Sequence, residues 1–158
     1  MTPRITPYLW FETQAEEAAA FYCSLFPNSR ITHRADYPET SPFPERVGQC
    51  LMVQFELDGQ AFAAFNGGAP MPFTHAISLM VDCESQAELD ALYARLTEGG
   101  QAEACGWLRD RYGLSWQLVP RRVMQLLQTP STHAQAFGAL MTMEKIDLAA
   151  VEAACNPS

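Results

Sequence analysis

The chain has 158 residues, which fits a single domain over residues 1–158 built from two small halves. Its composition is 48% hydrophobic and 11% aromatic, which is typical of a folded protein and excludes a disordered one. The formal net charge of −8 argues against nucleic acid and anionic membrane surfaces as partners, because both require basic patches.

No membrane span or secretion signal is expected. No apolar run approaches the roughly 20 residues that span a bilayer, and the first residues lack the apolar core of a signal peptide. The five cysteines are scattered, without a Cys-x-x-Cys pair, so neither a disulfide framework nor a zinc site is expected. We therefore expect a cytoplasmic protein.

The first half of the chain alternates strand and helix signals. A β-rich run at residues 5–11 predicts a strand, and Thr13-Gln-Ala-Glu16 predicts a helix start in which the Thr13 oxygen accepts a first-turn amide. The helix is expected to end at Pro27. Three further strands are predicted at residues 31–35, 47–57 and 60–65, the last two joined by a hairpin turn at Asp58-Gly59.

The second half repeats this order after a linker at residues 66–72. A strand is predicted at residues 74–81, and Ser85-Gln-Ala-Glu88 predicts a second capped helix that ends at Gly99-Gly100. Two or three strands follow up to Val119, with a tight turn at Tyr112-Gly113. Helices are then predicted at residues 121–127, 131–143 and 145–154; in the second of these, Ala134, Phe137, Leu140 and Met141 share one face.

The recurrence of Thr-Gln-Ala-Glu as Ser-Gln-Ala-Glu, each after an apolar strand, indicates a duplicated unit. The predicted fold class is α+β, with two tandem βαβββ modules at residues 3–68 and 73–120 and extra helices at residues 121–158. Chance similarity between two capped helices is the alternative.

Four segments carry a resemblance to a known family: residues 5–11 (Ile-Thr-Pro-Tyr-Leu-Trp-Phe), 16–22, 65–68 and 105–117. With the paired modules, they resemble the vicinal oxygen chelate superfamily of glyoxalases, bleomycin-resistance proteins and extradiol dioxygenases. Within it, the chain is most similar to the PhnB-like branch, often labelled 3-demethylubiquinone-9 3-methyltransferase. The resemblance implies modules whose mixed sheet curls into a cup around a small-molecule site.

In metal-dependent members of the superfamily, His and Glu ligands come from the first and last strands of each module. The corresponding positions here are Thr6 or Pro7, the segment Phe65-Asn66 (with Asn66 as the candidate ligand), His75 or Ala76, and Gln117. Neutral amides with one imidazole bind transition metals weakly, so no tightly bound catalytic metal is predicted and a weakly held divalent metal is the alternative.

Seven residues are candidates for lining the ligand pocket: Trp10, Phe65, Asn66, His75, Cys105, Trp107 and Gln117. Aromatic side chains offer flat apolar surface, and an amide can orient a ligand by donating and accepting. His75 is either a ligand or base, or a strand histidine held by a hydrogen bond. Gln117 either orients a ligand or satisfies a strand-end backbone group. A nucleophilic role for Cys105 would need a neighbouring base or cation, with Arg109 a doubtful one.

The function expected from the resemblance is small-molecule binding of the bleomycin-resistance type. Two alternatives stay open: a metal-dependent lyase, isomerase or dioxygenase using Asn66, His75 and Gln117, and a non-catalytic partner acting through a dimer surface. A homodimer is expected, because the C-terminal helices carry apolar faces. The methyltransferase label is not supported, because no Gly-rich loop joins a strand to a helix as S-adenosylmethionine enzymes require.

Overall fold

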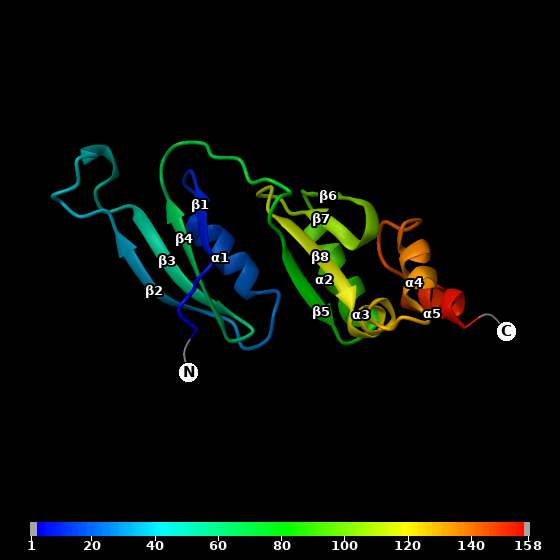
Figure 1. The fold of residues 1–158 in the computed structure, drawn as a ribbon. Coiled ribbons are helices and arrows are strands. Elements are labelled where there is room, and N and C mark those ends of the chain that lie inside the picture. The colour runs from blue at the N-terminus through cyan, green and yellow to red at the C-terminus, as the bar shows by residue number, and fades with distance from the viewer. Residues whose placement is uncertain (1–2, 157–158) are drawn as a thin grey trace. The chain divides into compact units, whose positions relative to one another are not determined.

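The computed structural model describes residues 3–156, which form two compact units that divide between Met71 and Pro72 (Figure 1). Each unit contains a four-stranded mixed sheet and a helix that follows its first strand. The predicted α+β class and the tandem βαβββ order are therefore confirmed. The second unit also holds the three C-terminal helices.

Unit 1 is built from β1 (Tyr8–Phe11), α1 (Ala15–Cys23), β2 (Arg30–Asp36), the short 3₁₀ helix η1 (Pro44–Arg46), β3 (Cys50–Leu57) and β4 (Gln60–Asn66). The strand order is β1-β4-β3-β2, with β1 parallel to β4 and the other pairs antiparallel. The predicted hairpin joins β3 to β4, and both turn residues have positive φ, 48° at Asp58 and 80° at Gly59. That conformation is the one a two-residue hairpin turn requires.

Helix α1 packs on one face of this sheet (Figure 1). Alternate strand residues on that face are buried, among them Phe11, Val53, Phe55 and Ala64. The opposite face, which we call the face away from α1, carries Tyr8, Trp10, Met52, Ala63 and Phe65, as the register shows.

Unit 2 contains β5 (Leu79–Cys83), α2 (Gln86–Thr97), β6 (Gln101–Ala102), the 3₁₀ turn η2 (Ala104–Gly106), β7 (Trp107–Arg109), β8 (Ser115–Pro120), α3 (Arg121–Gln128), α4 (His133–Leu140) and α5 (Leu148–Cys155). The strand order β5-β8-β7-β6 repeats the order of unit 1, with β5 parallel to β8. Helix α2 packs on the face that buries Leu108, Trp116 and Leu118. We call the other side the face away from α2.

The two helix starts differ, although their sequences match. Ser85 Oγ accepts the Glu88 N–H at 3.1 Å, and the Glu88 carboxylate accepts the Glu84 N–H at 2.7 Å, so the second capping box forms with its return bond one residue earlier. The first capping box is wrong. The N-cap of α1 is Gln14, and the Ala15 N–H donates to Asn66 Oδ1 at 2.8 Å. The Asn66 side chain of β4, and not that of Thr13, therefore accepts a backbone N–H at the start of α1.

Both first strands are shorter than predicted. Strand β1 begins at Tyr8, after Pro7, which has no N–H to pair. Strand β5 begins at Leu79, so His75 and Ala76 lie in a turn and the strand predicted at residues 74–81 is wrong over its first five residues. The physical reason is that β5 is an edge strand paired only with β8, and its pairing starts at Leu79 opposite Trp116.

The C-terminal helices pack on each other and are tied to the second module by backbone bonds. The Cys105 and Gly106 N–H groups donate to the Met143 and Glu144 carbonyls at 2.8 and 2.7 Å. In α4, Ala136 and Leu140 are buried, whereas Phe137 and Met141 are 52% and 59% exposed. The small residue Ala136 lies on the side of α4 that packs against α3 and α5. None of the helices in residues 3–156 is long and apolar enough to cross a membrane.

Candidate functional site

An aromatic cluster lies on the face away from α1. Trp10 of β1 is directly opposite Phe65 of β4, and their ring centroids are 5.0 Å apart. Tyr8 lies 6.3 Å from the same Phe65 ring and is 60% exposed. The indole N–H of Trp10 donates to the Ala69 carbonyl at 2.9 Å, which holds the ring over the segment after β4. Trp10 and Phe65, both predicted as pocket residues, are thus brought together.

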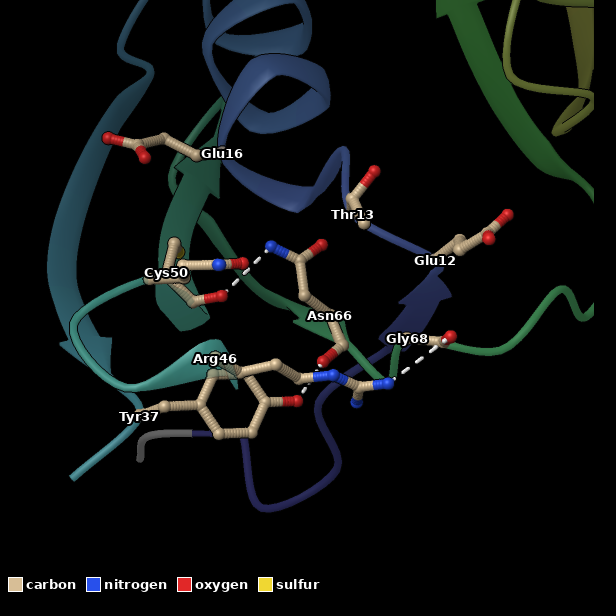
Figure 2. A pocket seen from close by; sticks show the side chains of 9 residues that line it. Glu12, Thr13, Glu16, Tyr37, Arg46, Cys50, Asn66 and Gly68 are labelled. Carbon is tan, nitrogen blue, oxygen red and sulfur yellow. Dashed lines mark hydrogen bonds between the residues drawn. The ribbon is translucent and has the colours of Figure 1, made fainter. Parts of the chain in front are cut away.

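Asn66 lies on the opposite side of the same sheet, beside α1 (Figure 2). Its Oδ1 caps α1, and its Nδ2 donates to the Cys50 carbonyl at 3.0 Å. The side chain is 7% exposed. Both ends of the amide are therefore engaged in holding the helix start and β3 to the end of β4.

A small cavity of about 110 Å³ lies beside Asn66 (Figure 2). Its walls come from the start of α1, the loop before β3 and the end of β4, and they are Glu12, Thr13, Glu16, Tyr37, Arg46, Gln49, Cys50, Asn66 and Gly68. Ligand pockets for drug-sized molecules are about 300–1,000 Å³, so this cavity has room only for water or a very small polar group.

The groups around the cavity are largely committed to backbone atoms. Arg46 donates to the Gly67 and Gly68 carbonyls at 3.0 and 3.4 Å, and the Tyr37 hydroxyl donates to the Asn66 carbonyl. Burial, together with the Glu16 carboxylate, raises the pKa of the Cys50 thiol. The Cys50 thiol is therefore neutral. The side chains around the cavity hold the end of β4 in place and present no reactive group.

The face away from α2 in unit 2 brings together Trp107 and Gln117. Gln117 of β8 is directly opposite Trp107 on one side and Met80 on the other. Its Nε2 donates to the Ser78 hydroxyl at 2.9 Å. Trp107 and Gln117 are half-buried and Met80 is 51% exposed, so an amide lies between two apolar side chains on an accessible surface.

A polar network lies on the same face, on the far side of Trp107. His75 Nε2 is 2.9 and 3.0 Å from the two Glu103 carboxylate oxygens. Arg109 donates from Nε to Glu103 at 2.7 Å and from Nη2 to Gln101 Oε1 at 2.6 Å. Burial alone would raise the pKa of Glu103, but hydrogen bonds from His75 and Arg109 and their charges outweigh it, and the pKa lies below its ordinary value.

The strand registers show on which face of its sheet each of these positions lies. Trp10 pairs with Phe65 in unit 1, and Met80 pairs with Gln117 in unit 2. Asn66 pairs with the buried Phe11 and lies on the α1 side of its sheet, whereas Gln117 lies on the face away from α2. Of the predicted segment Phe65-Asn66, Phe65 is the residue on the face away from the helix.

The other positions predicted from metal-dependent relatives also lack a ligand set. Thr6 and Pro7 precede β1, and His75 and Ala76 lie in the turn before β5. Within residues 3–156 no group of three or more His, Cys, Asp or Glu side chains is placed to hold a metal ion.

Cys105 lies apart from both faces, in the η2 turn, where its φ is +60°. Its Sγ is 3.7 Å from the Met141 sulfur, and its backbone N–H is bonded to the C-terminal segment. Arg109, the cation considered for activating it, is instead engaged with Glu103 and Gln101. Its position suits a structural link to the C-terminal helices.

Comparison with known proteins shows to which family the chain belongs. A family model described as 3-demethylubiquinone-9 3-methyltransferase matches residues 3–119, most of the chain and both βαβββ modules. The chain belongs to this PhnB-like family. A PhnB protein from Bacillus cereus, described with the same methyltransferase name, is 36% identical, and the match covers 75% of this chain and 99% of that one with a TM-score of 0.66.

More distant structures share the fold of this PhnB-like chain. Protein PA1353 from Pseudomonas aeruginosa is 20% identical over 74% of this chain and 96% of that one, with a TM-score of 0.59. The fosfomycin resistance protein FosX from Listeria monocytogenes is 12% identical over 82% and 99%, with a TM-score of 0.58. These two likenesses establish the vicinal oxygen chelate fold alone. No protein of curated function matches the chain.

Sequence reasoning missed Glu103, Arg109 and Gln101 as a network beside Trp107. One signal was present, because Trp107 and Arg109 are two residues apart in a strand and therefore share a face. The bond from His75 to Glu103 joins a turn to a loop and had no local signal.

Proposed function

We propose that this PhnB-like protein binds a small organic molecule on the face away from α2, with Trp107 and Met80 as apolar contacts and Gln117 as the orienting amide. Binding on this surface requires no tightly held metal. The observation that carries the proposal is the row Met80–Gln117–Trp107 across three adjacent strands, an amide between two partly exposed apolar side chains.

The chemistry of this row favours recognition over Lewis-acid catalysis. An amide flanked by aromatic and thioether groups can donate and accept one hydrogen bond each while a flat ligand packs on the indole. A divalent transition metal prefers imidazole, thiolate or carboxylate ligands, and Gln117 supplies none of these. The Ser78 hydroxyl fixes the amide's orientation from the strand start.

A melting-temperature screen in EDTA-containing buffer tests the proposal. A library of small aromatic and amide-bearing compounds is screened against the full chain, Gln117→Leu and Gln125→Leu. Gln125 is an exposed glutamine of α3 and serves as the matched control. We expect compounds that raise the melting temperature of the parent and of Gln125→Leu but not of Gln117→Leu. Equal stabilisation of Gln117→Leu would overturn the proposal.

A further inference from the structure

We propose that the ligand of this face carries a single carboxylate, which binds the outer end of the Arg109 guanidinium while its apolar part packs on Trp107. This inference rests on the proposed function and names the class of ligand. It arises from four residues that the family comparison does not single out: Gln101, Glu103, Arg109 and Ser115.

Arg109 is held in place by two acceptors. Glu103 takes the Nε–H and Gln101 takes one Nη2–H, at 2.7 and 2.6 Å. The Nη1 group and the second Nη2–H have no partner within the part of the chain that the structure describes. These two nitrogens form the end of a planar fork, and a fork whose other side is already fixed loses little freedom on binding a carboxylate.

The position of Arg109 places that fork beside the proposed binding row. Arg109 and Trp107 are alternate residues of β7, so both side chains stand on the face away from α2. Gln117, opposite Trp107, and Ser115, opposite Arg109, are alternate residues of β8 on the same face. A carboxylate at Arg109 and a ring at Trp107 would thus be carried on adjacent parts of one small molecule.

Ser115 is a second, independent indication that a polar ligand group binds near Arg109. Its residue is 1% exposed, and its Oγ has no hydrogen-bond partner among residues 3–156. A buried hydroxyl is normally hydrogen-bonded, so the Ser115 hydroxyl calls for a partner such as a water, an ion or a ligand atom. Ser115 is directly opposite Arg109 in the β7–β8 pair.

The charge of the network favours a monoanion. Glu103 lies within 2.7 Å of Arg109, and its lowered pKa keeps it ionised. A dianionic phosphate or phosphonate would be repelled by this carboxylate, whereas a planar carboxylate matches the fork with one negative charge. The ligand class is therefore a small aromatic or alkyl monocarboxylate.

The test uses phenylacetate as the probe and phenylacetamide as its uncharged counterpart. Each is titrated into the ¹⁵N-labelled full chain while the side-chain signals of Arg109 Nε–H, Trp107 indole N–H and the Gln117 amide are followed. Phenylacetate is expected to shift these signals saturably. Arg109→Gln should weaken its binding at least about tenfold. Arg111→Gln, two residues away in the β7–β8 turn, should leave it within about twofold.

Three results would overturn the inference: no saturable shift with phenylacetate, equal binding of phenylacetamide, or unchanged affinity in Arg109→Gln. Equal binding of both probes that is lost in Gln117→Leu would leave the proposed function standing without the carboxylate. Failure of both probes, together with an empty melting-temperature screen, would remove both proposals. Shifts spread over unrelated surface signals without saturation would also count against the inference.

Discussion

The Oδ1 atom of Asn66 accepts the backbone N–H of Ala15 at 2.8 Å, although the two residues are 51 positions apart in the chain. The bond joins the end of β4 to the first turn of α1, where backbone N–H groups otherwise lack partners. The same amide donates to the Cys50 carbonyl on β3. One side chain therefore replaces the local cap expected at Thr13 and connects three elements of unit 1.

Asn66→Ala should destabilise the protein by about 2 kcal/mol, because it removes a helix cap and leaves the Cys50 carbonyl without its donor. Urea unfolding gives the change in free energy. Thr13→Ala is the matched control and should cost less than about 0.5 kcal/mol, because Thr13 is exposed and is not the N-cap. A larger loss of stability in Thr13→Ala than in Asn66→Ala would show that Thr13 caps the helix after all.

Asp110→Asn should destabilise unit 2 by about 2–3 kcal/mol. The buried carboxylate accepts the Tyr112 and Leu114 N–H groups through Oδ1 and the Trp116 indole N–H through Oδ2 at 2.9 Å. An amide in its place would point a donor at one of these donors. Asp58→Asn, in the exposed β3–β4 turn where asparagine tolerates positive φ, should be nearly neutral in the same urea titration.

Cys83 should make stability fall at high pH. Burial, with the Glu88 and Asp82 carboxylates, raises the pKa of this thiol to about 12 from the model-compound value of 9.0. The unfolded thiol therefore loses its proton first, so the folded state binds more protons between these values. Stability contributed by the neutral thiol is present below pH 9 and is lost as the pH rises toward 12.

The pH effect is measured as the free energy of unfolding of the parent and Cys83→Ala from pH 8 upward. The stability difference between the two proteins should change with alkaline pH, the parent losing more. Parallel profiles for the two proteins would show that Cys83 does not titrate in this way.

Elemental analysis of protein purified without chelator should find less than about 0.1 equivalent of zinc, nickel, iron or manganese after dialysis. The expectation follows from Gln117 and Phe65, which lie in the last strands of the two modules on the faces away from α2 and α1 and supply no strong metal ligand. Gln117→Glu adds a carboxylate at one of them and should raise nickel affinity measurably by titration. Stoichiometric metal retained by the parent would contradict the expectation.

The parts of the fold that the sequence predicted correctly are those marked by local turn and helix-start signals. The Asp58-Gly59 turn and the Ser85 cap formed as expected because their hydrogen bonds are made within a few residues. The repeated order of strands and helices was also recoverable, since alternating apolar patterns mark each element.

The site was less predictable, because its bonds join distant segments. The segment Phe65-Asn66 could not be assigned to a face, since a one-residue change of register reverses a strand side chain and only the β1–β4 pairing shows that Asn66 lies on the α1 side. His75 was assigned to a strand, but an apolar run cannot show where an edge strand loses its partner. Trp10 with Phe65 and Trp107 with Gln117 were grouped as pocket residues, and each pair does share a face. Their role in binding, and the homodimer expected from the C-terminal helices, stay predictions.

The most direct test of the central claim is a calorimetric titration of the strongest ligand from the melting-temperature screen into protein treated with EDTA and into protein supplied with one equivalent of divalent metal. We expect the same dissociation constant in both, within about twofold, because the proposed contacts to the ligand come from Trp107 and Gln117 and not from a metal. Binding that appears only after metal is restored would contradict it and would favour the metal-dependent chemistry of the superfamily.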